Sequence, residues 1–391
     1  MATDFLHGIE VLEVDDGIRP IQTVRSSVIG LIGTAPDAVA ADWPLDTPVL
    51  VTNRRQLAGL GDSGSLPKAL AGIYDQAGAV VAVIRVTEGT DEADTLGNVA
   101  GSSLDGTGVH ALKAAQAVLG VSPRILIATG FTHQGTDGAT PANPVVAALL
   151  SVAPSMRAVV IADGPATTTA AALTYGQSLG SDRLFVVDPK VMVWSQEADA
   201  AVAEPASARV AGLIARIDNE RGFWWSPSNH EIAGIVGISR PVDFALSDSN
   251  SESNLLNEAK IATIIRNNGF RLWGNRTTAQ DPLWQFLPVR RTADLIYDSI
   301  ERALLWAMDR PLSRQLFADI EGSVNAYLRE LIALGAIVGG KAWLDPDLNT
   351  PATLQAGKLY VDFDIEPPAP LERLTFRAHR NAEYWTEALA I

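Results

Sequence analysis

Residues 159–188 read VVIADGPATTTAAALTYGQSLGSDRLFVVD, and this stretch decides the fold class. Two short apolar runs, VVIAD and LFVVD, enclose an alanine- and threonine-rich segment that is compatible with a helix from 167 to 179. Each run ends in an aspartate followed by glycine or proline, which is typical of the turn after a strand. Strand, helix and strand at this spacing predict a unit of an α/β fold with parallel strands.

The same alternation extends from residue 28 to residue 189. The β-rich apolar runs lie at 28–32, 49–52, 80–86, 125–129, 159–163 and 184–188. Helix-compatible stretches lie at 67–76, 108–119, 145–152 and 167–179. Because the runs are continuously apolar, they predict a largely parallel sheet covered by helices on both faces. Two segments rich in Gly, Thr, Asp and Pro, 90–107 and 130–144, are predicted to be exposed loops.

The pattern changes after the polar stretch ALSDSNSESN at 245–254, which is predicted to be an exposed boundary. Apolar residues recur every three or four positions in the segments that follow, which predicts helices at 254–265, 288–309 and 313–334. Gly335 is expected to end the last of these. Residues 358–365 alternate apolar and polar, as in a strand with one buried face. The expected fold class is therefore α/β, with a mixed α+β part in the C-terminal third.

Composition excludes several classes of protein. The 391 residues are 47% hydrophobic and 19% charged, so the chain contains enough apolar material for folded domains. The net charge of −15 argues against nucleic-acid binding, because an acidic surface repels phosphates. There is no cysteine, which excludes disulfides and thiolate metal sites. No run reaches the ~20 apolar residues of a membrane span, and the N-terminal residues do not resemble a signal peptide, so the chain is expected to stay in the cytoplasm where it is made.

Two features leave an enzymatic alternative open. Residues 59–64, GLGDSG, match the glycine spacing of dinucleotide-binding loops, but no buried strand directly precedes them, which favours a simple turn. Asp163 and Asp188 end two predicted parallel strands, where ligands and Mg²⁺ often bind, although aspartate before Gly-Pro or Pro is also an ordinary turn residue. The five histidines are far apart and have no metal-ligand spacing. No cofactor and no catalytic residue are predicted.

Both ends of the chain carry short β-like segments beside polar or proline-rich linkers. Residues 9–14, IEVLEV, precede Asp15-Asp16-Gly17, and residues 374–377, LTFR, follow the proline run at 367–370. A terminal strand needs a partner for its backbone N–H and C=O groups. It pairs either with a sheet of its own chain, which is the commoner outcome, or with the sheet of another subunit.

Several stretches, spread over nearly the whole chain, resemble the contractile tail sheath proteins of P2-like phages and R-type pyocins. They are FLHGIEVLEV with DG (5–17), SSVIG (26–30), GFWWSPSNHE (222–231), GIVGISRPV (234–242), LLNEAKIATIIRNNGFRLWGNRT (255–277), WAMD (306–309), DPDLN (345–349) and AGKLY (356–360). Residues 90–145 show the least resemblance. A resemblance of this extent disfavours an enzyme, although a sheath subunit of a cellular injection system stays open as an alternative.

The resemblance implies an architecture and a set of interface residues. Residues 1–27 would form an N-terminal arm and the start of an inner domain, 28–240 an outer α/β domain, 241–373 the inner, tube-facing domain, and 374–391 a C-terminal arm. Hexameric rings would stack helically around a tail tube, with each arm adding a strand to a neighbouring copy. The arm residues implied are Ile9, Val11, Leu12, Val14, Leu374, Phe376, Tyr384 and Trp385.

The resemblance also implies a mechanism and partners. The sheath would contract from a metastable extended state and drive the tube through the envelope of the target cell. Residues 254–329 contain 10 basic and 8 acidic side chains in an otherwise acidic protein, so this segment suits an acidic tube surface. The expected tube contacts are Arg290, Arg291, Arg302, Arg310 and Arg314. The other partners implied are baseplate and tail terminator proteins, in a virion tail assembled in the bacterial cytoplasm.

Overall fold

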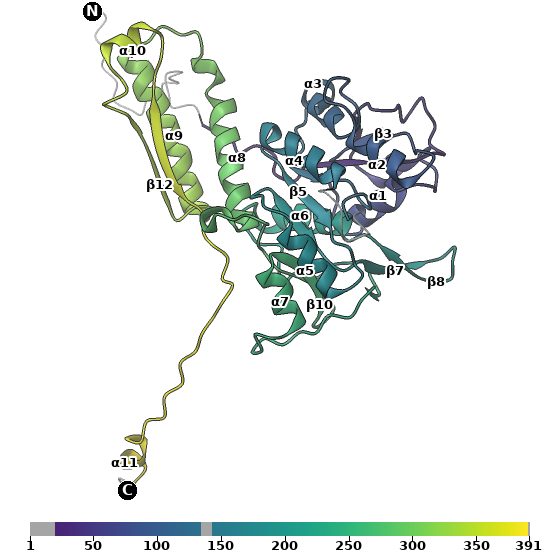
Figure 1. Cartoon of the computed structure of the whole chain (residues 1–391). Coiled ribbons are helices and arrows are strands. Elements are labelled where there is room, and N and C mark those ends of the chain that lie inside the picture. The colour runs from purple at the N-terminus through teal and green to yellow at the C-terminus, as the bar shows by residue number, and fades with distance from the viewer. Residues whose placement is uncertain (1–19, 134–142, 390–391) are drawn as a thin grey trace, which may run out of the picture.

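The computed structural model describes residues 20–133 and 143–389, and its largest element is an eight-stranded sheet (Figure 1). The strand order is β11-β10-β6-β5-β4-β1-β3-β2, in which the six strands from β10 to β3 are parallel to their neighbours. The edge strands β2 and β11 are antiparallel. The strands are β1 (Ile29–Thr34), β2 (Val49–Val51), β3 (Val81–Val86), β4 (Ile125–Ile127), β5 (Val159–Asp163), β6 (Leu184–Val187), β10 (Ile261–Arg266) and β11 (Phe270–Trp273). The expected α/β class and the largely parallel sheet are confirmed.

Helices cover both faces of this sheet because successive strand residues point to opposite sides. Ile161 packs in the cluster that contains α1 and α6, whereas Val160 packs in the cluster that contains α2 and α4. Both clusters are buried, which explains why the strands are apolar throughout. The helices of this body are α1 (Leu66–Tyr74), α2 (Glu92–Ala100), α3 (Ala115–Leu119), α4 (Pro144–Met156), α5 (Thr169–Gln177), α6 (Ser207–Arg221) and α7 (Glu252–Glu258), with 3-10 turns at Arg54–Leu57, Gly108–Ala114 and Pro282–Trp284.

A second unit stands beside this body and consists of two long helices and a two-stranded sheet (Figure 1). Helix α8 (Leu287–Ala303) is followed by a 3-10 turn (Leu305–Ala307) and then by α9 (Arg314–Leu334). Ser313 caps the N-terminus of α9, and Gly335 ends it in the left-handed conformation at φ 76°, as expected. Strands β12 (Gly339–Leu344) and β13 (Val361–Glu366) pair in antiparallel fashion and flank α10 (Pro351–Gln355). We call α8, α9, α10, β12 and β13 the helical unit.

A smaller three-stranded sheet has the order β8-β7-β9. It contains β7 (Val191–Ser195), β8 (Ala200–Glu204) and β9 (Gly237–Ile238). Strands β7 and β8 form a hairpin that projects from the body, away from the helical unit (Figure 1).

Three expectations need correction. Residues 254–265 are not one helix, because α7 ends at Glu258 and the β-branched run IATII forms strand β10 in the centre of a buried sheet. Residues 90–107 are not only loop, because Asp91 caps the N-terminus of α2 with its side chain and Leu96 and Val99 are buried. A boundary at 240/241 would cut through the eight-stranded sheet, since β10 and β11 belong to it, so the body extends to Trp273.

Candidate interaction surfaces

The C-terminal segment leaves the helical unit as an extended chain and ends in the short helix α11 (Tyr384–Leu389), far from the body (Figure 1). Residues 371–385 are all exposed. Leu374 is 65% exposed and Phe376 is 86% exposed, although both are apolar. No backbone hydrogen bond joins residues 367–381 to the rest of the described chain. This segment, residues 371–389, is called the C-terminal arm below.

The base of the C-terminal arm is anchored, in contrast to its distal part. Arg276 holds Glu372 through a two-pronged ion pair, in which the Arg276 Nε to Glu372 Oε1 distance is 2.8 Å. Pro367 is buried, and the prolines at 367, 368 and 370 restrict the backbone on the approach to Glu372. The arm therefore has a defined starting direction, and the freely exposed part begins after Glu372.

The sheet of the helical unit has one covered edge and one open edge. On the β12 side, the Asn325 amide of α9 accepts from the Ala342 N–H at 2.9 Å and donates to the Ala342 C=O at 2.8 Å, so it takes the place of a neighbouring strand. On the other side, β13 pairs with no strand of the described chain except β12. Phe363 of β13 packs edge-on against Tyr297 of α8, with ring centroids 5.8 Å apart, which fixes the apolar face of β13 inward. The outer edge of β13 is therefore open to strand addition.

The predicted arm residues fall into two groups. Ile9, Val11, Leu12 and Val14 lie outside the described residues. Leu374 and Phe376 lie in the extended part of the C-terminal arm, and Tyr384 and Trp385 begin helix α11 with 67% and 70% exposure. Residues 374–377 form no strand within this chain, so pairing with its own sheet, the commoner outcome, is not what the structure has.

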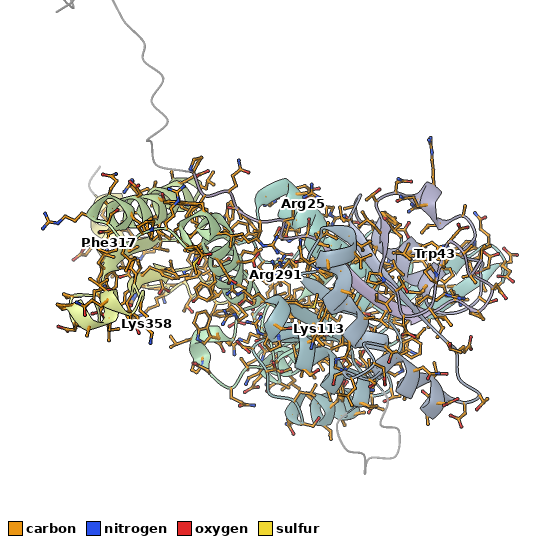
Figure 2. All side chains as sticks on the ribbon, turned by 90° about the horizontal axis from the view of Figure 1, so that it is seen from above. Arg25, Trp43, Lys113, Arg291, Phe317 and Lys358 are labelled. Atoms are coloured by element: carbon orange, nitrogen blue, oxygen red, sulfur yellow. The ribbon has the colours of Figure 1, made fainter. Side chains whose placement is uncertain are left out.

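Two of the five predicted tube-contact arginines are buried inside the chain. Arg290 pairs with Asp294 at 2.7 Å, and Arg291 pairs with Asp218 at 2.6 Å. Their residues are 8% and 4% exposed. Figure 2 shows Arg291 at the junction between the body and the helical unit, well away from Phe317 at the far end of that unit. These two positions are corrected: they hold α8 against the body instead of facing a partner.

The other three arginines lie at the surface. Arg302 contacts Asp298 and Ser122, each at 3.0 Å, beside the junction with the body. Arg310 and Arg314 lie in and just after the connection that follows α8 and are exposed, with the Arg310 guanidinium 4.8 Å from the centre of the Trp306 ring. Leu305 and Met308, in the same connection, are 71% and 67% exposed. This connection, residues 304–314, presents apolar and cationic side chains together and is called the α8–α9 tip.

Salt bridges fasten α8 to the body along its length. Asp294, 3% exposed as a side chain, pairs with Arg183 of the body at 2.6 Å as well as with Arg290. Asp298 pairs with Arg124, and burial lowers the pKa of that arginine. Sequence reasoning missed the pairs of Asp294 with Arg183 and of Asp298 with Arg124, as it missed Arg276 with Glu372, because these partners lie 96 to 174 residues apart and no local pattern joins them.

The residues of the enzymatic alternative are engaged in structural contacts. Asp163 accepts hydrogen bonds from the Ser207 N–H at 2.8 Å and the Ser207 hydroxyl at 2.6 Å. Asp188 accepts from the Ala166 N–H and pairs with Arg240 at 2.6 Å, and burial raises its pKa. Across residues 20–133 and 143–389, no group of acidic and histidine side chains could hold a metal ion. In the same ranges, no helix is long and apolar enough to cross a bilayer.

The glycine loop at 59–64 is a turn that the backbone requires. Gly59, Gly61 and Gly64 all have positive φ values. A Cβ at Gly64 would lie 2.3 Å from the Thr34 carbonyl oxygen, so the third glycine serves close packing against β1. The simple-turn interpretation accounts for this motif.

Sequence comparison relates nearly the whole chain to one family. Three family descriptions match in order: "Tail sheath protein Gp18 domain III N-terminal region" at 26–86, "Phage tail sheath protein central domain" at 106–278, and "Phage tail sheath C-terminal domain" at 279–380. A prophage major tail sheath protein of Pseudomonas aeruginosa is 39% identical, with 99% of each chain covered. The tail sheath protein of Escherichia phage P2 is 37% identical, with 98% of this chain and 97% of that protein covered.

Solved structures share the fold at lower identity. The sheath of an extracellular contractile injection system in its contracted state (PVC) superimposes with a TM-score of 0.71 and 16% identity, covering 98% of this chain and all of the other. The contracted helical sheath of the anti-feeding prophage gives 0.69 and 18%, covering 96% and 99%. The division of the matched families at 278/279 coincides with the end of the eight-stranded sheet, five residues after β11.

Proposed function

The chain belongs to the phage tail sheath family, and we propose that it polymerises by lending its terminal arms as strands to the sheets of neighbouring copies. It is a structural subunit of a contractile tail sheath and not an enzyme.

The C-terminal arm carries this proposal. It presents alternating apolar side chains at Leu374 and Phe376, and no backbone hydrogen bond joins residues 373–377 to any part of the described chain. The open edge of β13 offers the complementary row of N–H and C=O groups. A two-stranded sheet is marginal alone, and further strands stabilise it. Strand addition from a neighbouring copy satisfies both surfaces at once.

We propose that the N-terminal arm, residues 1–17, supplies a second exchanged strand, with Ile9, Val11, Leu12 and Val14 as its contact residues. Exchange in two directions joins every subunit to several neighbours, as stacked hexameric rings require. The structural relatives include a baseplate complex of the anti-feeding prophage, which supports a baseplate contact at the end of the sheath. A tail terminator protein would bind at the other end.

Contraction is proposed to run from a metastable extended state to a more stable contracted state, driving the tube through the target envelope. The solved relatives include sheaths in a contracted state. A kinetic barrier keeps the extended state from converting, as in other proteins whose persistence depends on a slow rate of conversion and not on equilibrium stability. Because α8 is fastened to the body through Asp294 and Asp298, the movement is proposed to occur between subunits while each subunit keeps its shape.

The tube contact is proposed to lie at the α8–α9 tip. Arg310 and Arg314 are exposed there beside Leu305 and Met308, which suits an acidic tube surface with apolar patches. Exposed ion pairs contribute only ~0–1 kcal/mol each, so such contacts can break during contraction. Double charge reversal, Arg310→Glu with Arg314→Glu, should weaken assembly on purified tube more than self-assembly.

The matched control for that experiment is Lys113→Glu, an exposed charge on the body (Figure 2). Equal loss of self-assembly and of tube-dependent assembly in the double variant would contradict the tube contact. The particle is proposed to be a phage-type tail assembled in the bacterial cytoplasm. Identities of 37–39% to phage and prophage sheaths, against 16–18% to the injection-system sheaths, support this choice.

Deletion of residues 374–391 tests strand exchange directly. The truncated protein should stay folded, because residues 374–385 are exposed throughout. It should no longer form tubes or polysheath in negative-stain electron microscopy. Deletion of residues 1–17 should have the same effect. Normal tubes from both truncated proteins would contradict strand exchange.

A further inference from the structure

The β7–β8 hairpin has a surface that the proposed strand exchange does not use. Trp194 of β7 is 54% exposed and lies opposite Ala201 of β8. Val236, which donates its backbone N–H to the Met192 carbonyl, is also 54% exposed. The tip, residues 195–199, carries two exposed acids, Glu197 and Asp199, and neither has an ion-pair partner in the described chain.

Apart from its five-residue length and the acidic Glu204 at its end, the outer strand of this hairpin is unprotected against strand addition. Strand β8 reads AAVAE, with no lysine, proline or bulge along its edge. Folded proteins normally protect such an edge or cover it with another segment. A projecting hairpin with an unprotected edge and an exposed tryptophan therefore points to a contact with another chain.

A cleft of opposite character lies at the junction of the body and the helical unit. Its volume is about 760 Å³, and its lining contains three arginines and no acid. Arg25 is exposed and has no ion pair in the described chain, whereas Arg124 and Arg302 are paired with Asp298. Val24, Leu50, Leu119 and Val121 add apolar surface. Figure 2 shows Arg25 at this junction.

We propose that the acidic tip of the β7–β8 hairpin of one copy docks into the arginine-lined cleft of a second copy. The inference rests on the proposed function in one respect, namely that copies of this chain assemble with one another. Glu197 and Asp199 meet Arg25 and Arg302, and the apolar flank at Trp194 covers the apolar wall of the cleft. The charges steer the encounter and suppress incorrect pairings, and the apolar contact holds the complex.

The two surfaces differ, so the contact is heterologous. A heterologous contact propagates and forms a ring when its rotation closes or a helix when it does not. It also lies apart from the β13 edge, so it supplies a link between copies that is independent of the arms. A neighbouring copy is the occupant that matches both the sign of the charge and the apolar wall.

The experiment is a charge swap in the full chain, read by sedimentation of polymer at several protein concentrations. Glu197→Lys with Asp199→Lys should raise the concentration needed for polymer at least about tenfold at low salt, and less at high salt. Arg25→Glu should have a similar effect. The combination of all three substitutions should lower that concentration at least about threefold below the value of either set alone, since the glutamate placed at position 25 then faces lysine instead of a like charge.

The matched control is Asp105→Lys, an exposed acid on a different loop of the body. Melting by circular dichroism should stay cooperative in every variant and change little, because Glu197, Asp199 and Arg25 are exposed and only Asp199, at φ 45°, favours its native residue type through its backbone. Failure of the triple variant to recover would overturn the pairing. The same result is expected if the cleft is filled by another part of the same chain and not by a second copy. Loss of assembly on deleting 374–391, with hairpin variants that assemble normally, would refute this contact and leave strand exchange intact.

Discussion

Replacing the two apolar side chains of the C-terminal arm by serine, in the variant Leu374→Ser with Phe376→Ser, should block polymerisation without unfolding the subunit. Both side chains are mostly exposed in the isolated chain, at 65% and 86%, so their removal takes little contact away from the folded monomer. Under the proposed strand exchange, their surface becomes buried only when the arm adds to a neighbouring sheet. The substitution therefore separates assembly from folding.

The size of the effect follows from these exposed fractions. Full burial of a Leu or Phe side chain contributes about 1.5–3 kcal/mol. Scaled by the exposed fractions, the pair contributes about 2–4.5 kcal/mol per arm, as an upper limit because ordering the arm opposes it. At 1.4 kcal/mol per factor of ten, this corresponds to about a 30-fold to 1,500-fold loss in the association constant.

The assay is the critical concentration for polymer, measured by sedimentation and checked by electron microscopy, with thermal melting as the measure of folding. The matched control is Leu104→Ser, a leucine that is 95% exposed on a loop of the body. The control should assemble and melt like the parent protein. Parent-like assembly of the double arm variant, with its melting unchanged, would refute the argument that the C-terminal arm buries these side chains in a neighbour.

Three further predictions concern the subunit itself, each measured by chemical denaturation. Asp294→Asn breaks a buried carboxylate pair with Arg183 and Arg290 and should destabilise by about 3–5 kcal/mol, whereas Asp105→Asn should have no effect. Asn325→Ala leaves the Ala342 N–H and C=O without the amide that covers them and should cost about 1–3 kcal/mol. Gly64→Ala places a Cβ 2.3 Å from the Thr34 carbonyl at φ +91° and should cost at least about 1–3 kcal/mol, and unchanged stability would contradict the packing role of this turn.

The elements that sequence predicts well are those with local causes. The apolar runs at 125–129 and 159–163 predict buried parallel strands, because each apolar side chain contributes a favourable free energy when it leaves water, largely independently of its neighbours in the sequence. Gly335 ends α9 because a left-handed position favours glycine whatever surrounds it. The prediction failed at 261–265, where a helical spacing of apolar residues competes with β-branched side chains, and the sheet decides the outcome.

The interaction surfaces were harder to predict because the sequence alone does not show where a charged residue lies in the folded chain. Arg290 and Arg310 are equivalent in composition, yet Asp294 and Asp182 surround the first, and the second is exposed above Trp306. The local i,i+4 pair with Asp294 and the contact with Asp182, 108 residues away in the chain, distinguish them. The arm at 374–377 was predictable as an exposed apolar segment in need of a partner. The open edge of β13 is identified only from the structure, in which Asn325 covers the opposite edge of the same sheet at β12.

The distribution of strong and weak contacts constrains how the sheath can move. Asp294 and Asp298 bind α8 to the body through largely buried ion pairs, and breaking such a pair costs about 3–5 kcal/mol. The distal C-terminal arm, by contrast, has no backbone hydrogen bond to the described body, and its base is fixed by the half-exposed pair of Arg276 and Glu372, worth ~0–1 kcal/mol. A force applied along the sheath would therefore break the pair of Arg276 and Glu372 and move the chain from residue 371 onward before it separated α8 from the sheet. Under the proposed strand exchange, contraction can then reorient whole subunits while the exchanged strands stay paired, because the compliant segment lies between the exchanged strand and the helical unit of the same subunit.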